Sequence, residues 1–92
     1  MYNPDTFNEL IKEVRQERAR QHELWDAAAP DCTVYTYLSV LSEEVGEANR
    51  AVLDREFGDA WKKEPDKFRE EMIQVAAVAM QILERLERGE LL

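Results

Sequence analysis

The chain carries the stretch Ser42-Glu43-Glu44-Val45-Gly46-Glu47 inside a pattern of apolar residues that repeats with the period of an α-helix. Positions three residues apart share one face of a helix, so Glu44 lies over Glu47. The expected apolar stripe of this helix consists of Leu38, Leu41, Val45, Ala48 and Val52. Glu44 falls beside that stripe and not opposite it, which predicts a carboxylate close to the core.

A second stretch, Arg69-Glu70-Glu71-Met72-Ile73-Gln74, repeats the pattern on a later helix. Its expected apolar stripe consists of Phe68, Met72, Val75, Ala79, Ile82 and Leu86. Carboxylates are rarely buried unless they are paired or bind a metal. Glutamates that lean into the apolar stripes of two helices therefore predict a metal site. The alternative is that both pairs lie on exposed helix faces.

The composition limits the classes of function. At 92 residues, the chain is expected to form one domain over residues 1–92. A net charge of −8 argues against nucleic acid as a partner. Cys32 is the one cysteine, so no internal disulfide is possible. We expect no signal peptide, and the run Val75–Met80 is too short to span a membrane, so the expected protein is soluble and cytoplasmic, with no membrane partner.

Capping signals and apolar periodicity predict an all-α fold. The expected long helices run from Asn3-Pro4-Asp5-Thr6 to a break at Ala29-Pro30-Asp31, from Thr33 or Val34 to about Phe57, and from the cap Asp66 to about Arg88. Thr6 and Glu9 fit a capping box for the first helix. A short helical turn is expected within residues 59–65, which gives a bundle of three long helices plus a short one.

Apolar residues occur on more than one face of the second and third helices, for example at Val40, Ala51, Val78 and Met80. One copy of a three-helix chain would leave part of this surface exposed. We therefore expect the core to be completed by homo-oligomerisation. The first helix loses its apolar stripe between Arg15 and Glu23, where it either lines a polar cavity or forms an exposed helix end.

The chemistry of the candidate ligands indicates which metal they would bind. Glu44, Glu47 and Glu71 offer oxygen atoms, which suit Mg²⁺ or Mn²⁺. One histidine and one cysteine cannot form the usual zinc site. A di-iron bundle would need Glu-x-x-His pairs, which the sequence lacks. Glu43 or Glu70, next to the ligands, could orient a water molecule or accept its proton.

Basic residues between the two acidic stretches indicate an anionic substrate. Six of the twelve lie there: Arg50, Arg55, Lys62, Lys63, Lys67 and Arg69. Arg50 shares a face with Glu47, so a phosphate chain held by a metal could also contact Arg50 and Lys62. A solvated helix end and loop is the alternative. Trp25 could stack on a base and Gln21 could read its edge, with packing in the core or an interface as the alternative.

At these residues the chain resembles the MazG-like nucleotide pyrophosphohydrolases of the all-α NTP pyrophosphatase superfamily. That family carries E-E-x-x-E on one helix and E-x-x-D on a later one. The first motif is complete as Glu43-Glu44-Val45-Gly46-Glu47, and the second aligns with Glu71-Met72-Ile73-Gln74. Segments 17–25 and 74–79 are also similar to the family, so the resemblance covers nearly the whole chain.

The resemblance implies hydrolysis of a nucleoside triphosphate to a monophosphate and pyrophosphate, with Mg²⁺, in a homodimer or a dimer of dimers. It implies Glu44, Glu47 and Glu71 as metal ligands and Glu43 as a supporting carboxylate. Gln74 takes the place of the family's aspartate, so this ligand would be neutral and would bind metal more weakly. The alternative is a helical interaction or regulatory module that keeps the family's shape with little or no activity.

Overall fold

The computed structural model describes residues 1–26, 33–57 and 66–90. Within these ranges all regular structure is helical, which confirms the all-α prediction. The elements are α1 (Pro4–Gln21), a π-helical turn η1 (His22–Asp26), α2 (Val34–Phe57) and α4 (Lys67–Glu87). The short helical turn expected within residues 59–65 lies outside the described residues. None of the described helices is long and apolar enough to cross a membrane.

The helix α1 begins at a different cap from the one that the sequence predicts. The side chain of Asn3 accepts hydrogen bonds from the backbone N–H groups of Asp5, at 2.9 Å, and Thr6, at 3.1 Å. Thr6 therefore lies in the first turn, and the predicted Thr6–Glu9 capping box is wrong. Asparagine is among the best N-cap residues, and Pro4 suits the first helical position, so the helix starts earlier. The bounds of α2 and α4 agree with the prediction to within one residue.

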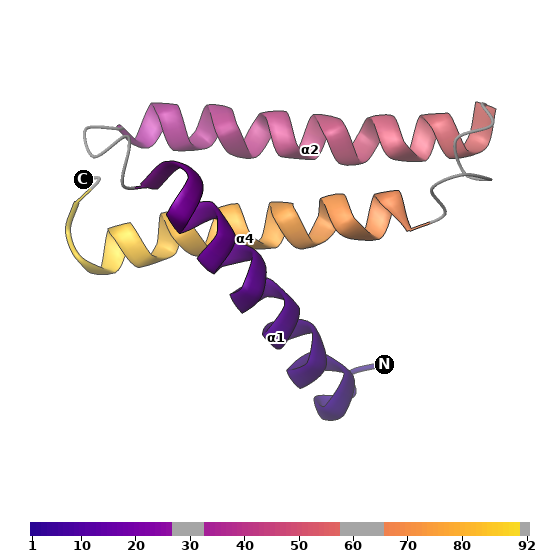
Figure 1. Ribbon diagram of the computed structural model, residues 1–92, viewed down its shortest axis with the longest axis horizontal. Helices are drawn as coiled ribbons and strands as arrows, with labels where there is room; N and C mark the ends of the chain where they lie inside the picture. Colours follow the sequence, from indigo (N-terminus) through magenta and orange to yellow (C-terminus); the bar gives the residue numbers. More distant parts are fainter. Residues whose placement is uncertain (27–32, 58–65, 91–92) are drawn as a thin grey trace.

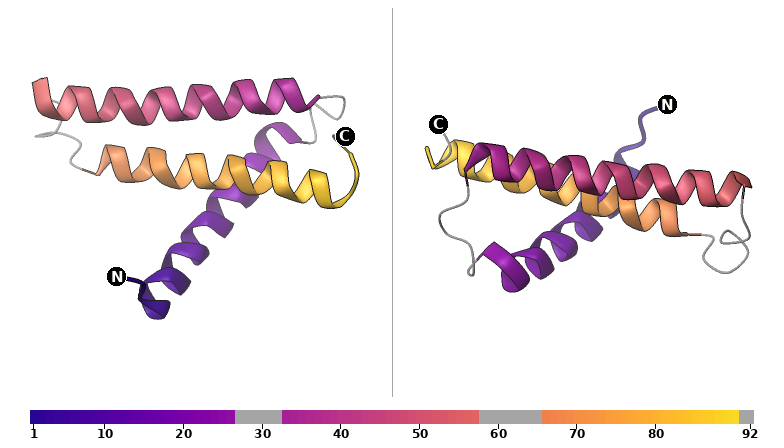
Figure 2. Two further views of the ribbon diagram at one scale, coloured as in Figure 1. Left: turned by 180° about the vertical axis from the view of Figure 1, so that it is seen from behind. Right: turned by 90° about the horizontal axis from the view of Figure 1, so that it is seen from above.

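The helices α2 and α4 run antiparallel, side by side, and α1 crosses α4 on one side of this pair (Figure 1). The views from behind and from above agree, and they show the N-terminal half of α1 extending away from the pair (Figure 2). Ion pairs attach α1 to α4. The Nε of Arg18 donates to Oε2 of Glu84 at 2.7 Å, and Nη1 of Arg69 donates to Oε1 of Glu13 at 2.8 Å.

The buried side chains form a small and partly polar core. Its apolar members are Tyr37, Ala48, Ala77 and Val78, and its polar members are Gln21, Glu71, Gln81 and Arg85. The amide of Gln81 donates to the hydroxyl of Tyr37 at 3.3 Å. The guanidinium of Arg85 lies 4.8 Å from the centroid of the same ring. These contacts offset part of the cost of burying polar groups between α2 and α4.

The predicted apolar stripes lie largely outside this core. Leu38 and Val45 are 47% and 48% exposed, and Phe68 and Met72 are 39% and 44% exposed. In each helix, the exposed stripe residues come one position later in the sequence than residues that face the partner helix. Leu38, for example, comes directly after the buried Tyr37. Because α2 and α4 are antiparallel, both stripes turn to the same side of the pair, opposite α1. These four residues therefore lie outside the core that one copy of the chain forms, since no described helix covers that side.

Candidate metal centre

Three glutamates meet where α2 and α4 face each other. One side-chain oxygen from each of Glu44, Glu47 and Glu71 lies within 4.8 Å of the other two. Glu44 and Glu47 are one turn apart on α2, whereas Glu71 comes from α4. In an octahedral Mg²⁺ shell, opposite oxygens are roughly 4.2 Å apart. The three carboxylates therefore need only small adjustments to bind one ion, and we call this group the carboxylate cluster.

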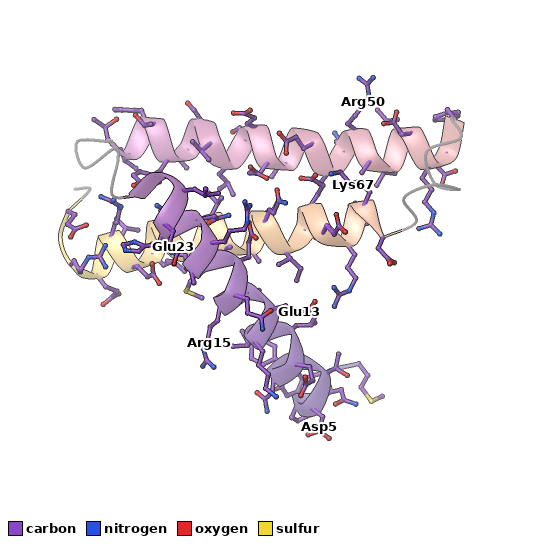
Figure 3. The ribbon with its side chains drawn as sticks, viewed as in Figure 1. Asp5, Glu13, Arg15, Glu23, Arg50 and Lys67 are labelled. Atoms are coloured by element: carbon purple, nitrogen blue, oxygen red, sulfur yellow. The ribbon has the colours of Figure 1, made fainter. Side chains whose placement is uncertain are left out.

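The cluster is buried at one end and open at the other. Glu71 is only 4% exposed, Glu44 is partly buried, and Glu47 is exposed. A buried carboxylate requires a partner of opposite charge or a hydrogen-bond donor. Lys67 supplies one, because its Nζ lies 3.2 Å from Oε1 of Glu71. Figure 3 shows Lys67 between α2 and α4, and solvent reaches the cluster from the side of Glu47.

Gln74 completes the group from one turn further along α4. With its amide nitrogen turned towards the cluster, it donates to Oε2 of Glu44 at 2.9 Å and to Oε2 of Glu71 at 3.3 Å. With the amide reversed, its carbonyl oxygen faces the same carboxylate oxygens. A carbonyl oxygen and a carboxylate oxygen repel each other at this distance unless a cation or a proton lies between them. The first orientation therefore suits the metal-free site, and the second would add a neutral fourth ligand to a metal-bound site.

The electrostatic state of the cluster shows how strongly the carboxylates interact. Partial burial raises the pKa of Glu44 above its ordinary value, and the charges of Glu47, Glu71, Glu43 and Glu17 raise it further. Desolvation raises the pKa of Glu47, followed by a hydrogen bond with Glu71, while the charge of Lys67 lowers it. A raised pKa means that Glu44 and Glu47 hold protons more tightly than isolated glutamates do. A divalent cation would relieve the same repulsion.

A cleft of about 370 Å³ lies beside the cluster, between α1 and α4. Its lining residues are Glu13, Gln16, Glu17 and Arg20 from α1, and Arg69, Glu70, Ile73 and Gln74 from α4. Gln74 contacts the cluster and lines the cleft, so the two features adjoin. Ligand sites in proteins commonly have volumes of roughly 300–1,000 Å³.

The two predicted catalytic carboxylates differ in position. Glu70 is exposed and lines the cleft next to Gln74. Glu43 is exposed on α2 and lies close enough to raise the pKa of Glu44 and Glu47, but it does not line the cleft. The geometry therefore favours Glu70 for a role within the cleft and Glu43 for a charge beside the carboxylate cluster.

The predicted substrate-binding residues are not brought together. Arg50 points away from α4 on the outer side of α2 and pairs with Asp54 at 3.3 Å (Figure 3). Gln21 is buried and donates to Glu17 at 3.4 Å, so it supports a cleft residue from behind. Trp25 belongs to η1, but its side chain is outside the described part, as is all of Lys62.

Several residues of this region were not predicted as site residues. Of the two interpretations of the polar stretch 15–23, the structure favours the cavity, because Gln16, Glu17 and Arg20 line the cleft. The spacing of Lys67 and Glu71, four residues apart on one helix, could have identified their ion pair. The contact of Arg69 with Glu13 joins residues 56 positions apart and leaves no signal in the spacing.

Comparisons of this chain with protein families, with curated proteins and with solved structures find no match.

Proposed function

We propose that the protein is a Mg²⁺-dependent nucleoside triphosphate pyrophosphohydrolase that controls nucleotide pools in the cytoplasm. The observation that carries this proposal is the convergence of Glu44, Glu47 and Glu71 from two helices beside a cleft. The sequence motifs that resemble the MazG-like family supply these three glutamates. The spacing of the motifs and the proximity of the side chains are independent observations, and both support a metal site.

The chemistry of the donors suits a hard cation. Carboxylate oxygens from Glu44, Glu47 and Glu71 would hold Mg²⁺ or Mn²⁺, and the carbonyl oxygen of Gln74 would complete the protein's share of the ligands. When bound, such an ion supplies neutralisation of phosphate charge and lowers the pKa of a coordinated water. The exposed position of Glu47 leaves that side of the cluster open to a nucleotide.

The residues of the chain supply the remaining functions. Glu70 lines the cleft beside Gln74 and is the favoured proton acceptor for the hydrolytic water. Lys67 balances the charge of Glu71 and limits the repulsion within the cluster. Gln21 and Arg20 both contact Glu17, which keeps that carboxylate in a fixed place on the wall of the cleft.

A second candidate function is a helical interaction module without activity. The observation that favours it is that Lys67 and the amide of Gln74 satisfy Glu71 and Glu44 without any metal. Release of pyrophosphate from a panel of nucleoside triphosphates, with Mg²⁺ or Mn²⁺, separates the two candidates. The enzyme should release pyrophosphate from at least one member of the panel, whereas the interaction module should release none.

The proposal includes a homodimer or a dimer of dimers. The apolar residues Leu38, Val45, Phe68 and Met72 form one face of the α2–α4 pair, opposite α1, and they are all exposed. The radius of gyration is 14.8 Å, against about 12 Å for a compact domain of this length. The accessible surface is 6873 Å², against roughly 5,500 Å² for a compact monomer of this mass. Two copies that pack these faces together would form a four-helix core.

A further inference from the structure

Two arginines approach the cleft from different helices. Arg20 lies near the C-terminal end of α1, and Arg69 lies near the N-terminal end of α4. Arg20 pairs with Glu17, and both line the cleft together with Gln74, which contacts the carboxylate cluster. Arg69 contacts Glu13, two turns earlier on α1 than Arg20. Because α1 extends away from the α2–α4 pair towards its N-terminus (Figure 2), the contact at Glu13 lies farther from α2 than the contact at Glu17.

Each arginine is held by a glutamate of α1. Arg20 donates from Nε to Oε2 of Glu17 at 2.8 Å. Arg69 donates from both terminal nitrogens to the carboxylate of Glu13. The members of the Arg69–Glu13 pair are both substantially exposed, and such pairs contribute little to stability. A guanidinium presents the same two donors to phosphate as to carboxylate, so a phosphate can take the place of Glu13.

We infer that Arg69 and Arg20 bind the polyphosphate chain of the substrate along the α1–α4 cleft, with Arg69 contacting the phosphate farthest from the carboxylate cluster. This inference rests on the proposed function and names the residues that select its substrate class. Arg20, beside the cluster, contacts phosphates in chains of any length. Arg69 adds a contact only when the chain is long enough, so it makes the site prefer triphosphates to shorter anions.

The charge of the cleft sets a condition for this binding. Among its lining residues, the carboxylates of Glu13, Glu17 and Glu70 outnumber the guanidinium groups of Arg20 and Arg69. A polyphosphate alone would meet a net negative surface, so its binding should require Mg²⁺. Displacement of Glu13 by phosphate leaves that carboxylate at an exposed position, where water solvates it.

The alternative is that Arg69 has only a structural role and attaches α4 to α1. Two variants separate these roles. Arg69→Gln removes the guanidinium, whereas Glu13→Gln weakens the same ion pair but keeps Arg69. If the pair is only an attachment, both changes should act alike. If Arg69 binds phosphate, Glu13→Gln should preserve or tighten binding, because Arg69 loses a competing partner. Arg50→Gln is the control, since Arg50 is an exposed, ion-paired arginine on the outer side of α2.

The test is calorimetric titration of the full chain with inorganic tripolyphosphate and with orthophosphate, in the presence and absence of Mg²⁺. The wild type should bind tripolyphosphate more tightly than orthophosphate, only with Mg²⁺. Arg69→Gln should weaken tripolyphosphate binding about tenfold or more and leave orthophosphate binding unchanged. Glu13→Gln and Arg50→Gln should retain the preference.

Three results would overturn the inference. Arg69→Gln and Glu13→Gln could lose tripolyphosphate affinity equally, Arg69→Gln could bind tripolyphosphate as tightly as the wild type, or the wild type could fail to bind tripolyphosphate. Parallel assays of pyrophosphate release from nucleotides separate it from the proposed function. If the wild type hydrolyses a nucleotide and Arg69→Gln binds tripolyphosphate as the wild type does, the role of Arg69 is refuted and the proposed function is not. Binding of tripolyphosphate that depends on Arg69, without hydrolysis of any nucleotide, would support the inference and refute the enzyme.

Discussion

The ammonium group of Lys67 lies 3.2 Å from the buried carboxylate of Glu71, one turn further along α4. A lysine of the same helix thus provides a positive charge at the position where a divalent cation would bind. The pair favours the metal-free state, and at the proposed metal site it would oppose an incoming divalent cation. Lys67 would therefore link the stability of the metal-free protein to its affinity for Mg²⁺.

The substitution Lys67→Met should test this link. Loss of the ammonium should lower the metal-free melting temperature, by about 4–8 °C if the pair contributes about 1 kcal/mol. The rise in melting temperature on adding Mg²⁺ should become larger, because the ion no longer competes with the lysine. Lys12→Met is the matched control, since Lys12 pairs with Glu9 at 3.0 Å on the exposed surface of α1. A smaller Mg²⁺ effect in Lys67→Met than in the wild type would contradict the competition.

Gln74 provides a second test of the cluster. Gln74→Asp removes the amide donor and adds a negative charge, so the metal-free protein should melt at a lower temperature. The same charge should tighten Mg²⁺ binding by about tenfold or more in calorimetric titration. Gln16→Asp is the control, because Gln16 lines the cleft but not the cluster. Unchanged Mg²⁺ affinity in Gln74→Asp would mean that Gln74 does not take part in metal binding.

The raised pKa values predict how stability depends on pH. Burial raises the pKa of Glu44 and desolvation raises that of Glu47, so the folded state binds protons more tightly than the unfolded state. This contribution to stability is full below the ordinary pKa of 4.5 and is lost as the pH rises through the raised values. The stabilisation by Mg²⁺ should therefore grow between pH 4.5 and neutrality, as the ion replaces the protons.

Melting curves of the wild type and Glu47→Gln, with and without Mg²⁺, would measure this pH dependence. Glu47→Gln should lose the Mg²⁺ effect at every pH. A Mg²⁺ effect that is equal at both ends of the range, or equal in the two proteins, is not compatible with metal binding at the cluster.

The exposed apolar face predicts the oligomeric state. Sedimentation at micromolar concentration should give at least twice the 10.8 kDa mass of the chain. Leu38→Glu should dissociate the assembly, because it places a charge within that face. Leu53→Glu should not, since Leu53 is an equally exposed leucine about 80° further around α2 than Val45. A wild type that sediments as a monomer, with a melting temperature independent of concentration, would exclude the assembly.

Local sequence signals predicted the helices well and the cluster in part. Asp66 precedes α4 as predicted, but its side chain makes no capping hydrogen bond, so the predicted side-chain cap is wrong. Gly89, with a φ of 70°, follows the last turn of α4 as predicted, because this signal depends on nearby residues alone. The three-residue spacing of Glu44 and Glu47 placed both on one face for the same reason. Their meeting with Glu71 depends on the register between two antiparallel helices, and periodicity does not contain that register. The similarity between the two acidic stretches was the sequence signal that suggested that Glu71 meets Glu44 and Glu47.

The sequence was less informative about burial and about the cleft. The apolar stripes of Leu38 and Met72 show which residues share a face, but not whether the chain itself covers that face. The buried Gln21 has a polar side chain that no apolar pattern would place in a core. The pairing of Arg69 with Glu13 depends on the angle at which α1 crosses α4, and crossing angles follow from packing and not from the spacing within either helix.

The proposed function is tested most directly by identifying the products formed from nucleoside triphosphates with Mg²⁺. A pyrophosphohydrolase should form equal amounts of nucleoside monophosphate and pyrophosphate from at least one substrate. Loss of a metal ligand should remove several kcal/mol of charge stabilisation, so Glu71→Gln should reduce the rate on the order of 1000-fold. Glu56→Gln, which changes an exposed glutamate of α2, should keep the wild-type rate. The proposed activity would be contradicted if the products are nucleoside diphosphate and orthophosphate, or if no nucleoside triphosphate in the full panel gives a product. An unaltered rate in Glu71→Gln would also contradict it.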